Sequence, residues 1–135
     1  MASPLLRTHD IDQIRQAAAQ INHDPSKYIT IASLADDIGL NTDKLKRGFR
    51  QLFNSSVYQY VIIRRLQKAL HLLEETDLPI KQIAYKTGFD SKDGFSRSFQ
   101  SKFHTTPSSY RKKYLLSPDQ NISLSLGCMA FPNLN

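Results

Sequence analysis

Apolar residues recur every three to four positions along most of the chain, the spacing of an α-helix that buries one face. The clearest example is the run of Phe95, Phe99 and Phe103, which is separated by Ser, Arg, Gln and Lys. Four-residue spacing advances about 40° around a helix of 3.6 residues per turn, so the three rings form one slowly drifting stripe. This pattern predicts a buried aromatic stripe and a polar face turned away from it.

The same periodicity predicts an all-α fold of about seven helices. With their caps, the expected helices cover residues 10–23, 30–38, 41–53, 57–74, 79–87, 90–103 and 106–113. Thr30, Asn41 and Asp90 are expected N-caps, and Gly39 and Gly88 are expected helix ends. Pro79 fits the first turn of its helix. The uncharged stretch after Asp119 contains alternating apolar residues, so a short strand, a docked extension and a disordered end all remain open.

Two segments of the chain resemble each other, which indicates an internal repeat. Residues 29–40 align with residues 78–89 at a shift of 49, and the following residues align at a shift of 50. Each copy is a short helix, a glycine turn and a second helix with a bulky apolar face. The matched residues are Ile31/Ile80, Leu34/Ile83, Ala35/Ala84, Gly39/Gly88, Asp43/Asp93, Leu45/Phe95, Arg47/Arg97, Phe49/Phe99, Phe53/Phe103 and Tyr60/Tyr110.

This outline is that of a helix-turn-helix, in which the second helix enters the DNA major groove with its N-terminal residues against base edges. The residues expected to read bases are Asp43, Lys46 and Arg47 in the first copy and Lys92, Asp93, Ser96 and Arg97 in the second. An Asp in such a position can accept a hydrogen bond from cytosine N4. It can also pair with the Arg four residues later, and we favour that pairing.

Charge and composition agree with a polyanion as partner. The net charge is +6, and residues 41–113 carry 15 Lys and Arg against 6 Asp and Glu. The chain has one cysteine, Cys128, and four scattered histidines, so the sequence predicts no internal disulfide, no metal site and no cofactor. It contains no catalytic motif and is not expected to be an enzyme. No apolar segment approaches about 20 residues, which predicts a soluble, cytoplasmic protein.

From about Ile11 to Lys113 the sequence resembles the DNA-binding domain of the AraC/XylS family of bacterial transcription regulators. The resemblance is strongest over residues 77–112, where I-x-x-I-A, G-F, F-S-R-x-F and F-x-x-x-P-x-x-Y-R follow at the family's spacing. It implies double-stranded DNA read in two successive major grooves and activation of transcription through RNA polymerase. Such regulators usually carry an effector-binding or dimerisation domain before the DNA-binding part, so the resemblance implies either a stand-alone small activator or the C-terminal domain of a longer protein, and we favour the second. The segment LNTDKLKRGFRQLF further resembles regulators that respond to iron or siderophores.

The resemblance suggests a division into five parts: a flexible N-terminal end at 1–9, a first helix-turn-helix unit at 10–56, a linking helix at 57–75, a second unit at 76–114 and a tail of unknown order at 115–135. About 18 residues of helix span about 27 Å. This length, together with the widths of the units at its two ends, could bridge successive major grooves about 34 Å apart.

Phosphate contacts are expected from a second set of residues, namely Lys44, Arg50, Ser56, Arg64, Arg65, Gln100, Thr106 and Ser108. Such contacts add affinity without sequence choice. Basic residues on exposed helix faces need no function, however, and helix capping alone explains serine and threonine at helix starts.

Two alternative functions remain open on the sequence. The basic face of a helical module can bind an acidic protein, and a non-specific architectural protein binds DNA without sequence preference. The matched arginines of the repeat favour specific DNA binding over both.

Overall fold

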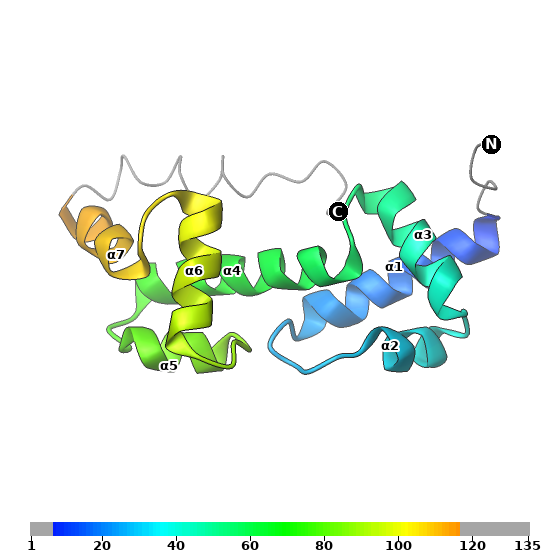
Figure 1. The fold of residues 1–135 in the computed structure, drawn as a ribbon, viewed down its shortest axis with the longest axis horizontal. Coiled ribbons are helices and arrows are strands. Elements are labelled where there is room, and N and C mark those ends of the chain that lie inside the picture. The colour runs from blue at the N-terminus through cyan, green and yellow to red at the C-terminus, as the bar shows by residue number, and fades with distance from the viewer. Residues whose placement is uncertain (1–6, 117–135) are drawn as a thin grey trace. The chain divides into compact units, whose positions relative to one another are not determined.

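The computed structural model describes residues 7–116, which form seven α-helices and no strand (Figure 1). The expectation of an all-α fold with about seven helices is therefore confirmed for this part of the chain. The helices are α1 (Thr8–His23), α2 (Ile31–Ile38), α3 (Thr42–Phe53), α4 (Val57–Glu75), α5 (Ile80–Lys86), α6 (Lys92–Phe103) and α7 (Pro107–Leu116). The chain divides into two compact units, the first ending at Val61 and the second beginning at Ile62, inside α4.

The first helix starts earlier than the sequence indicated. The backbone N–H of Arg7 donates to the Asp10 carboxylate over 3.3 Å, so Asp10 lies in the first turn and α1 begins at Thr8. A carboxylate in this turn pairs with the exposed N–H groups and the positive end of the helix dipole. The prediction of a flexible end over residues 1–9 is therefore wrong for Thr8 and His9.

Side-chain caps fix the starts of α2 and α3. The Thr30 hydroxyl accepts from the backbone N–H of Ser33 over 3.0 Å, and the Asn41 side chain accepts from that of Lys44 over 2.8 Å. Between them, Gly39 has φ +76°, a left-handed conformation in which a side chain would be strained. The predicted caps and the predicted glycine turn are confirmed here.

The predicted cap of α6 is wrong by one residue. Ser91, not Asp90, has the extended backbone of an N-cap, and its hydroxyl accepts from the N–H of Gly94 over 3.0 Å. The internal repeat aligns Ser91 with Asn41, the cap of α3, so the shift of 50 predicts Ser91 as the cap of α6. Asp90 is exposed and lies one residue before this cap.

The helices α4 and α7 have hydroxyl caps as well. Ser56 accepts from the N–H of Gln59 over 3.1 Å at the start of α4, and Thr106 accepts from that of Ser109 over 3.1 Å at the start of α7. Because α7 continues to Leu116, the first two residues of the predicted tail are helical. The alternating apolar residues beyond them, and Cys128, lie outside the described residues.

The core of the first unit is an aromatic cluster with apolar residues of α1 and α2 around it. The Phe49 ring lies 4.8 Å from that of Phe53 and 5.2 Å from that of Tyr60, centroid to centroid. The Tyr60 hydroxyl, buried with its ring, donates to the Asn22 side chain over 3.1 Å. Ring pairs at this spacing stabilise a core beyond the area they bury.

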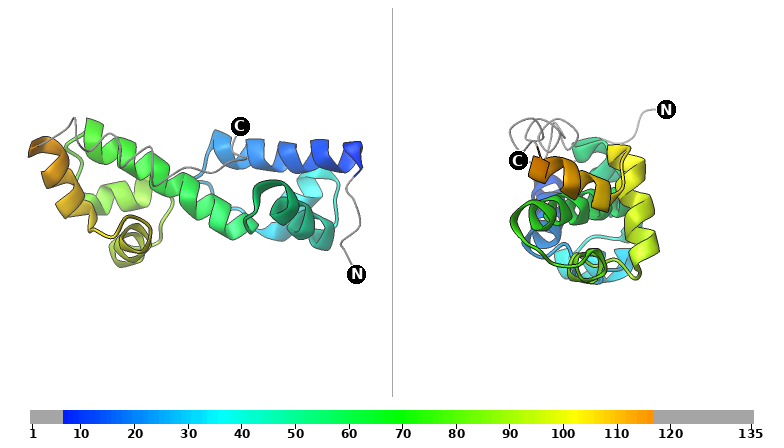
Figure 2. Two further views of the ribbon diagram at one scale, coloured as in Figure 1. Left: turned by 90° about the horizontal axis from the view of Figure 1, so that it is seen from above. Right: turned by 90° about the vertical axis from the view of Figure 1, so that its left-hand side faces the viewer.

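The second unit repeats this cluster at the matched positions. Phe99 lies 4.7 Å from Phe103 and 5.9 Å from Tyr110, and Phe95 and Phe99 are fully buried. The predicted phenylalanine stripe is thus the face by which α6 packs into its unit. Within that unit α6 crosses α5 steeply, standing upright in Figure 1 and seen end-on in the left view of Figure 2.

Arg111 stabilises the connection between α4 and α5. The guanidinium of Arg111 donates to the carbonyl oxygens of Leu73, Thr76 and Leu78 over 3.2, 3.1 and 2.7 Å. The hydroxyl of the neighbouring Tyr110 donates to the Glu74 carboxylate. The end of a helix leaves carbonyls without intrahelical partners, and Arg111 binds one of these at Leu73 together with two carbonyls of the connection after α4, at Thr76 and Leu78. The Tyr-Arg pair of α7 therefore fixes the turn that leads into α5.

Candidate nucleic-acid interface

The helices α3 and α6 present the same residue types at the same positions. Counting from the caps Asn41 and Ser91, an Asp is the second helical residue and an Arg the sixth in both helices. All four of these charged side chains are exposed, on the sides opposite the buried rings. The structure therefore leaves available the charged residues that the sequence analysis assigned to base reading.

The acidic residues behave differently in the two helices. The Asp43 carboxylate accepts from Nη2 of Arg47 in a close ion pair, with 71% and 53% of the two side chains exposed. This pairing agrees with the interpretation favoured above. No ion pair joins Asp93 to Arg97 within residues 7–116, so the same expectation fails in α6. Exposed pairs four residues apart contribute only about 0.3–0.5 kcal/mol, so equal spacing does not enforce pairing.

The other predicted base-reading residues lie beside these positions. Lys46 and Lys92 are exposed, and Ser96 is half-buried. Thr42 is exposed as the first residue of α3 and corresponds to Lys92 at the shift of 50, although it is not among the residues expected to read bases. Contact of Thr42 with a base is a prediction that the repeat alone supports.

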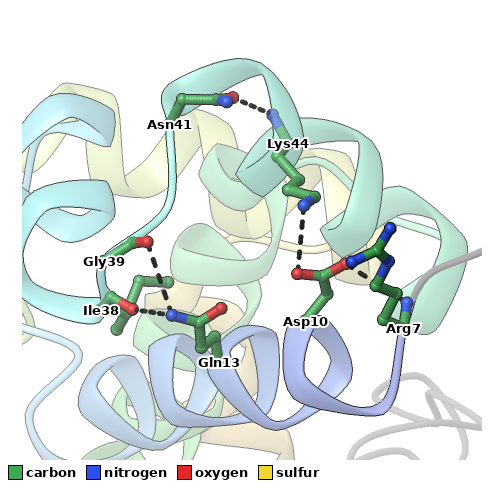
Figure 3. Close-up of polar contacts among 7 residues, drawn as sticks. All are labelled: Arg7, Asp10, Gln13, Ile38, Gly39, Asn41 and Lys44. Atoms are coloured by element: carbon green, nitrogen blue, oxygen red, sulfur yellow. Dashed lines mark hydrogen bonds and ion pairs between the residues drawn. The ribbon is translucent and has the colours of Figure 1, made fainter.

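Lys44 has a structural partner that the sequence did not predict. Its ammonium lies 3.2 Å from the buried carboxylate of Asp10, which also accepts from the Arg7 backbone (Figure 3). Burial raises the pKa of Asp10, but the hydrogen bonds and positive charge of Lys44 and Arg7 outweigh it, so the pKa lies below its ordinary value. Lys44, expected to contact phosphate, thus ties α3 to the start of α1.

A second contact from α1 supports the turn between α2 and α3. The side-chain amide of Gln13 donates to the carbonyl oxygen of Ile38 over 2.7 Å, and the Gly39 carbonyl lies 3.5 Å away (Figure 3). A Cβ added at Gly39 would approach this amide nitrogen to 3.2 Å. Gln13 and Asp10 therefore position α3 although neither belongs to the helix pair, and their 25- and 34-residue separations left no signal in the sequence.

The predicted phosphate contacts fall into three groups. Arg50, Gln100 and Ser108 are exposed, whereas Ser56 and Thr106 cap helices. The remaining two arginines make contacts inside the second unit: Arg64 donates to Gln67, and the Arg65 guanidinium lies 6.0 Å from the centre of the Phe89 ring. For all of these residues phosphate contact remains a prediction.

Over residues 7–116 no three His, Cys, Asp or Glu side chains gather where a metal ion could bind. No helix in this part of the chain is long and apolar enough to cross a membrane.

Comparison with known proteins identifies the family. A family model described as a helix-turn-helix domain matches residues 34–113, more than half of the chain. The probable transcription factor PqrA of Proteus vulgaris is 34% identical over 97 residues, which cover 72% of this chain and 79% of PqrA. The chain belongs to the AraC-type helix-turn-helix DNA-binding domains. An AraC-type domain is a DNA-binding domain and is itself non-enzymatic.

Other relatives place this AraC-type domain within longer proteins. The transcriptional regulator AlkR of Acinetobacter baylyi is 33% identical over 101 residues, which cover 75% of this chain but 33% of AlkR. The chain thus spans about a third of that relative's length. Among solved structures, the DNA-binding domain of the global transcriptional factor AdpA, in complex with a target DNA, has a TM-score of 0.75 at 24% identity, covering 79% of this chain and 97% of that domain. At this identity the likeness concerns the fold.

Proposed function

We propose that this AraC-type domain regulates transcription by binding a specific double-stranded DNA site with α3 and α6, each in a major groove. The observation that supports this best is the common register of the two helices. Each unit buries an aromatic stripe and leaves an arginine exposed at the sixth helical position. An exposed side chain near the N-terminus of such a helix reaches base edges when the helix enters the groove.

The exposed residues suit different roles on DNA. Arginine binds guanine O6 and N7 with two hydrogen bonds, so Arg47 and Arg97 are proposed to read guanine. Lys46 and Lys92 can donate to base edges or to nearby phosphates, and Ser96 can donate or accept. Arg50 and Gln100 occupy matched positions three residues after these arginines and are proposed to contact phosphates.

The charge distribution supports binding that weakens with salt. Each phosphate neutralised by a lysine or arginine releases condensed counterions, so the logarithm of the affinity falls linearly with the logarithm of the salt concentration. Within α3 the ion pairs of Lys44 and Arg47 reduce the positive charge that is available for phosphates. We expect the exposed cations of α3 and α6 to dominate the salt dependence.

Selection from a pool of random duplexes tests the proposal directly. The expected result is an enriched motif with two conserved blocks about one helical turn of DNA apart, roughly 10 base pairs. Affinity without an enriched motif would indicate a non-specific architectural protein. No affinity at moderate salt would indicate a protein-interaction module, and either result would refute sequence-specific binding.

Finer features of the regulation rest on the family resemblance. Activation through RNA polymerase is proposed on that ground, and the run-off transcript from a promoter carrying the selected site tests it. A response to iron or a siderophore is supported only by the resemblance of residues 40–53 to regulators of that kind, and the relatives named above add no support. Cytoplasmic location is the corresponding prediction for a protein that acts on bacterial DNA.

A further inference from the structure

The two recognition helices differ by one polar contact at matched positions. The Asp43 carboxylate accepts from Nη2 of Arg47, whereas Asp93 and Arg97 have the same spacing and the same helical positions without such a contact in the described part of the chain. All four side chains are exposed, so differences in burial do not explain the contact. In the first copy of the repeat Arg47 is therefore restrained by an ion pair with Asp43, whereas in the second copy Asp93 does not restrain Arg97.

Holding an arginine changes how it can bind a base. A long side chain loses rotamer freedom when it docks, and less is lost if the side chain is already fixed. The Asp43 contact uses one of the five N–H donors of the guanidinium, which leaves donors on Nε, Nη1 and Nη2 for guanine O6 and N7. The carboxylate also repels phosphate, so Arg47 is kept from the nearby backbone of the DNA.

We propose that Asp43 is a specificity-determining positioning residue that holds Arg47 for a guanine, so that the base pair at Arg47 is read more strictly than the base pair at Arg97. The inference deepens the proposed function and rests on it. Arg97 can turn between base edge and phosphate because Asp93 does not restrain it. The first half of the DNA site then tolerates fewer changes at its arginine-read position than the second half.

The matched variants Asp43→Asn and Asp93→Asn test this inference. Both remove one negative charge at the second residue of a helix and keep the size of the side chain, but only the first removes the ion pair. Each variant and the wild-type chain are subjected to selection from random duplexes. Arg47→Ala and Arg97→Ala identify which base pair each arginine reads.

The expected result is a loss of preference in one half of the site only. Asp43→Asn should lower the preference for the best base over the next, at the base pair sensitive to Arg47→Ala, by about twofold, which is the size of effect that an exposed pair four residues apart can supply. Asp93→Asn should change the corresponding preference at the Arg97 base pair by a smaller factor than Asp43→Asn does at the Arg47 base pair. Both variants should raise the affinity for random DNA alike, because each gains one net positive charge.

The double variant Asp43→Asn/Arg47→Ala separates positioning from direct reading. If Asp43 acts through Arg47, the added Asp43→Asn change alters no base preference beyond that of Arg47→Ala. A further loss at a neighbouring base pair means that Asp43 itself contacts a base, and it overturns the inference, as does unchanged preference in Asp43→Asn alone. A wild-type chain that enriches no motif overturns the proposed function and this inference together.

Discussion

The ammonium of Lys44 lies 3.2 Å from the carboxylate of Asp10, and this contact joins the first turn of α1 to the first turn of α3. The Asp10 side chain is 8% exposed and the Lys44 side chain 45%. A buried carboxylate is destabilising unless hydrogen bonds and opposite charge replace its water. Asp10 has both, from Lys44 and from the backbone of Arg7.

We expect Asp10→Asn to lower stability in a pH-dependent way. Since the pKa of Asp10 in the folded protein lies below its ordinary value of 3.8, folding favours the ionised form. The resulting stabilisation is complete above about pH 5 and is lost as the pH falls through the lowered pKa. Urea unfolding should give a lower midpoint for the variant at pH 7 and a smaller difference from wild type at pH 3. The exposed Asp12→Asn is the control, and a difference that does not vary with pH would contradict the prediction.

Ser91→Ala is expected to destabilise the second unit by about 1 kcal/mol, the usual cost of losing an N-cap. The hydroxyl of Ser91 is the acceptor for the N–H of Gly94, which would otherwise face only water. Thermal unfolding measures the change. Asp90→Ala, one residue earlier, should cost less than about 0.5 kcal/mol as an exposed substitution. An equal loss of stability in Ser91→Ala and Asp90→Ala would contradict the assignment of Ser91 as the cap and would favour Asp90.

Arg111→Ala is expected to cost about 2 kcal/mol, since it removes three charge-assisted hydrogen bonds to half-buried carbonyl groups. Chemical unfolding and hydrogen exchange at the amides of residues 73–80 should both respond. The exposed neighbour Lys112→Ala provides the comparison and should stay near wild type. A stability loss below about 0.5 kcal/mol in Arg111→Ala would show that the three bonds are replaced by water without cost.

Arg97→Ala should weaken binding to the selected DNA site by about 1–3 kcal/mol and relax the preference at one base pair. A gel-shift titration against the site and against its single-base variants measures both quantities. Ser101→Ala, one turn further along α6 and also exposed, should leave the preference unchanged. Retained affinity and selectivity in both Arg47→Ala and Arg97→Ala would refute the assignment of α3 and α6 as the reading helices.

Local signals in the sequence were sufficient for the helices and for most of their ends. Thr30, Asn41 and Gly39 act within three or four residues of themselves, so pattern and residue type located them. The buried rings Phe95, Phe99 and Phe103 followed from periodicity alone. The error at Asp90 arose because two neighbouring residues are both good caps, and the backbone angles decide between them.

Contacts between distant residues were beyond the reach of the sequence. Asp10 with Lys44, Gln13 with Ile38 and Arg111 with three carbonyls join positions 25 to 38 residues apart, and no periodic pattern marks them. The pairing of Asp43 but not Asp93 was out of reach for a different reason. The energy of an exposed pair is small compared with the effect of its surroundings, so identical spacing gave two outcomes.

The equal distance from cap to arginine in α3 and α6 has an evolutionary consequence. With α3 and α6 reading DNA as proposed, a mutation that alters one helix leaves the other unchanged, so the protein would keep part of its affinity for the old operator while it acquires a new preference. A regulatory circuit that uses such a domain would then change one half of its operator at a time.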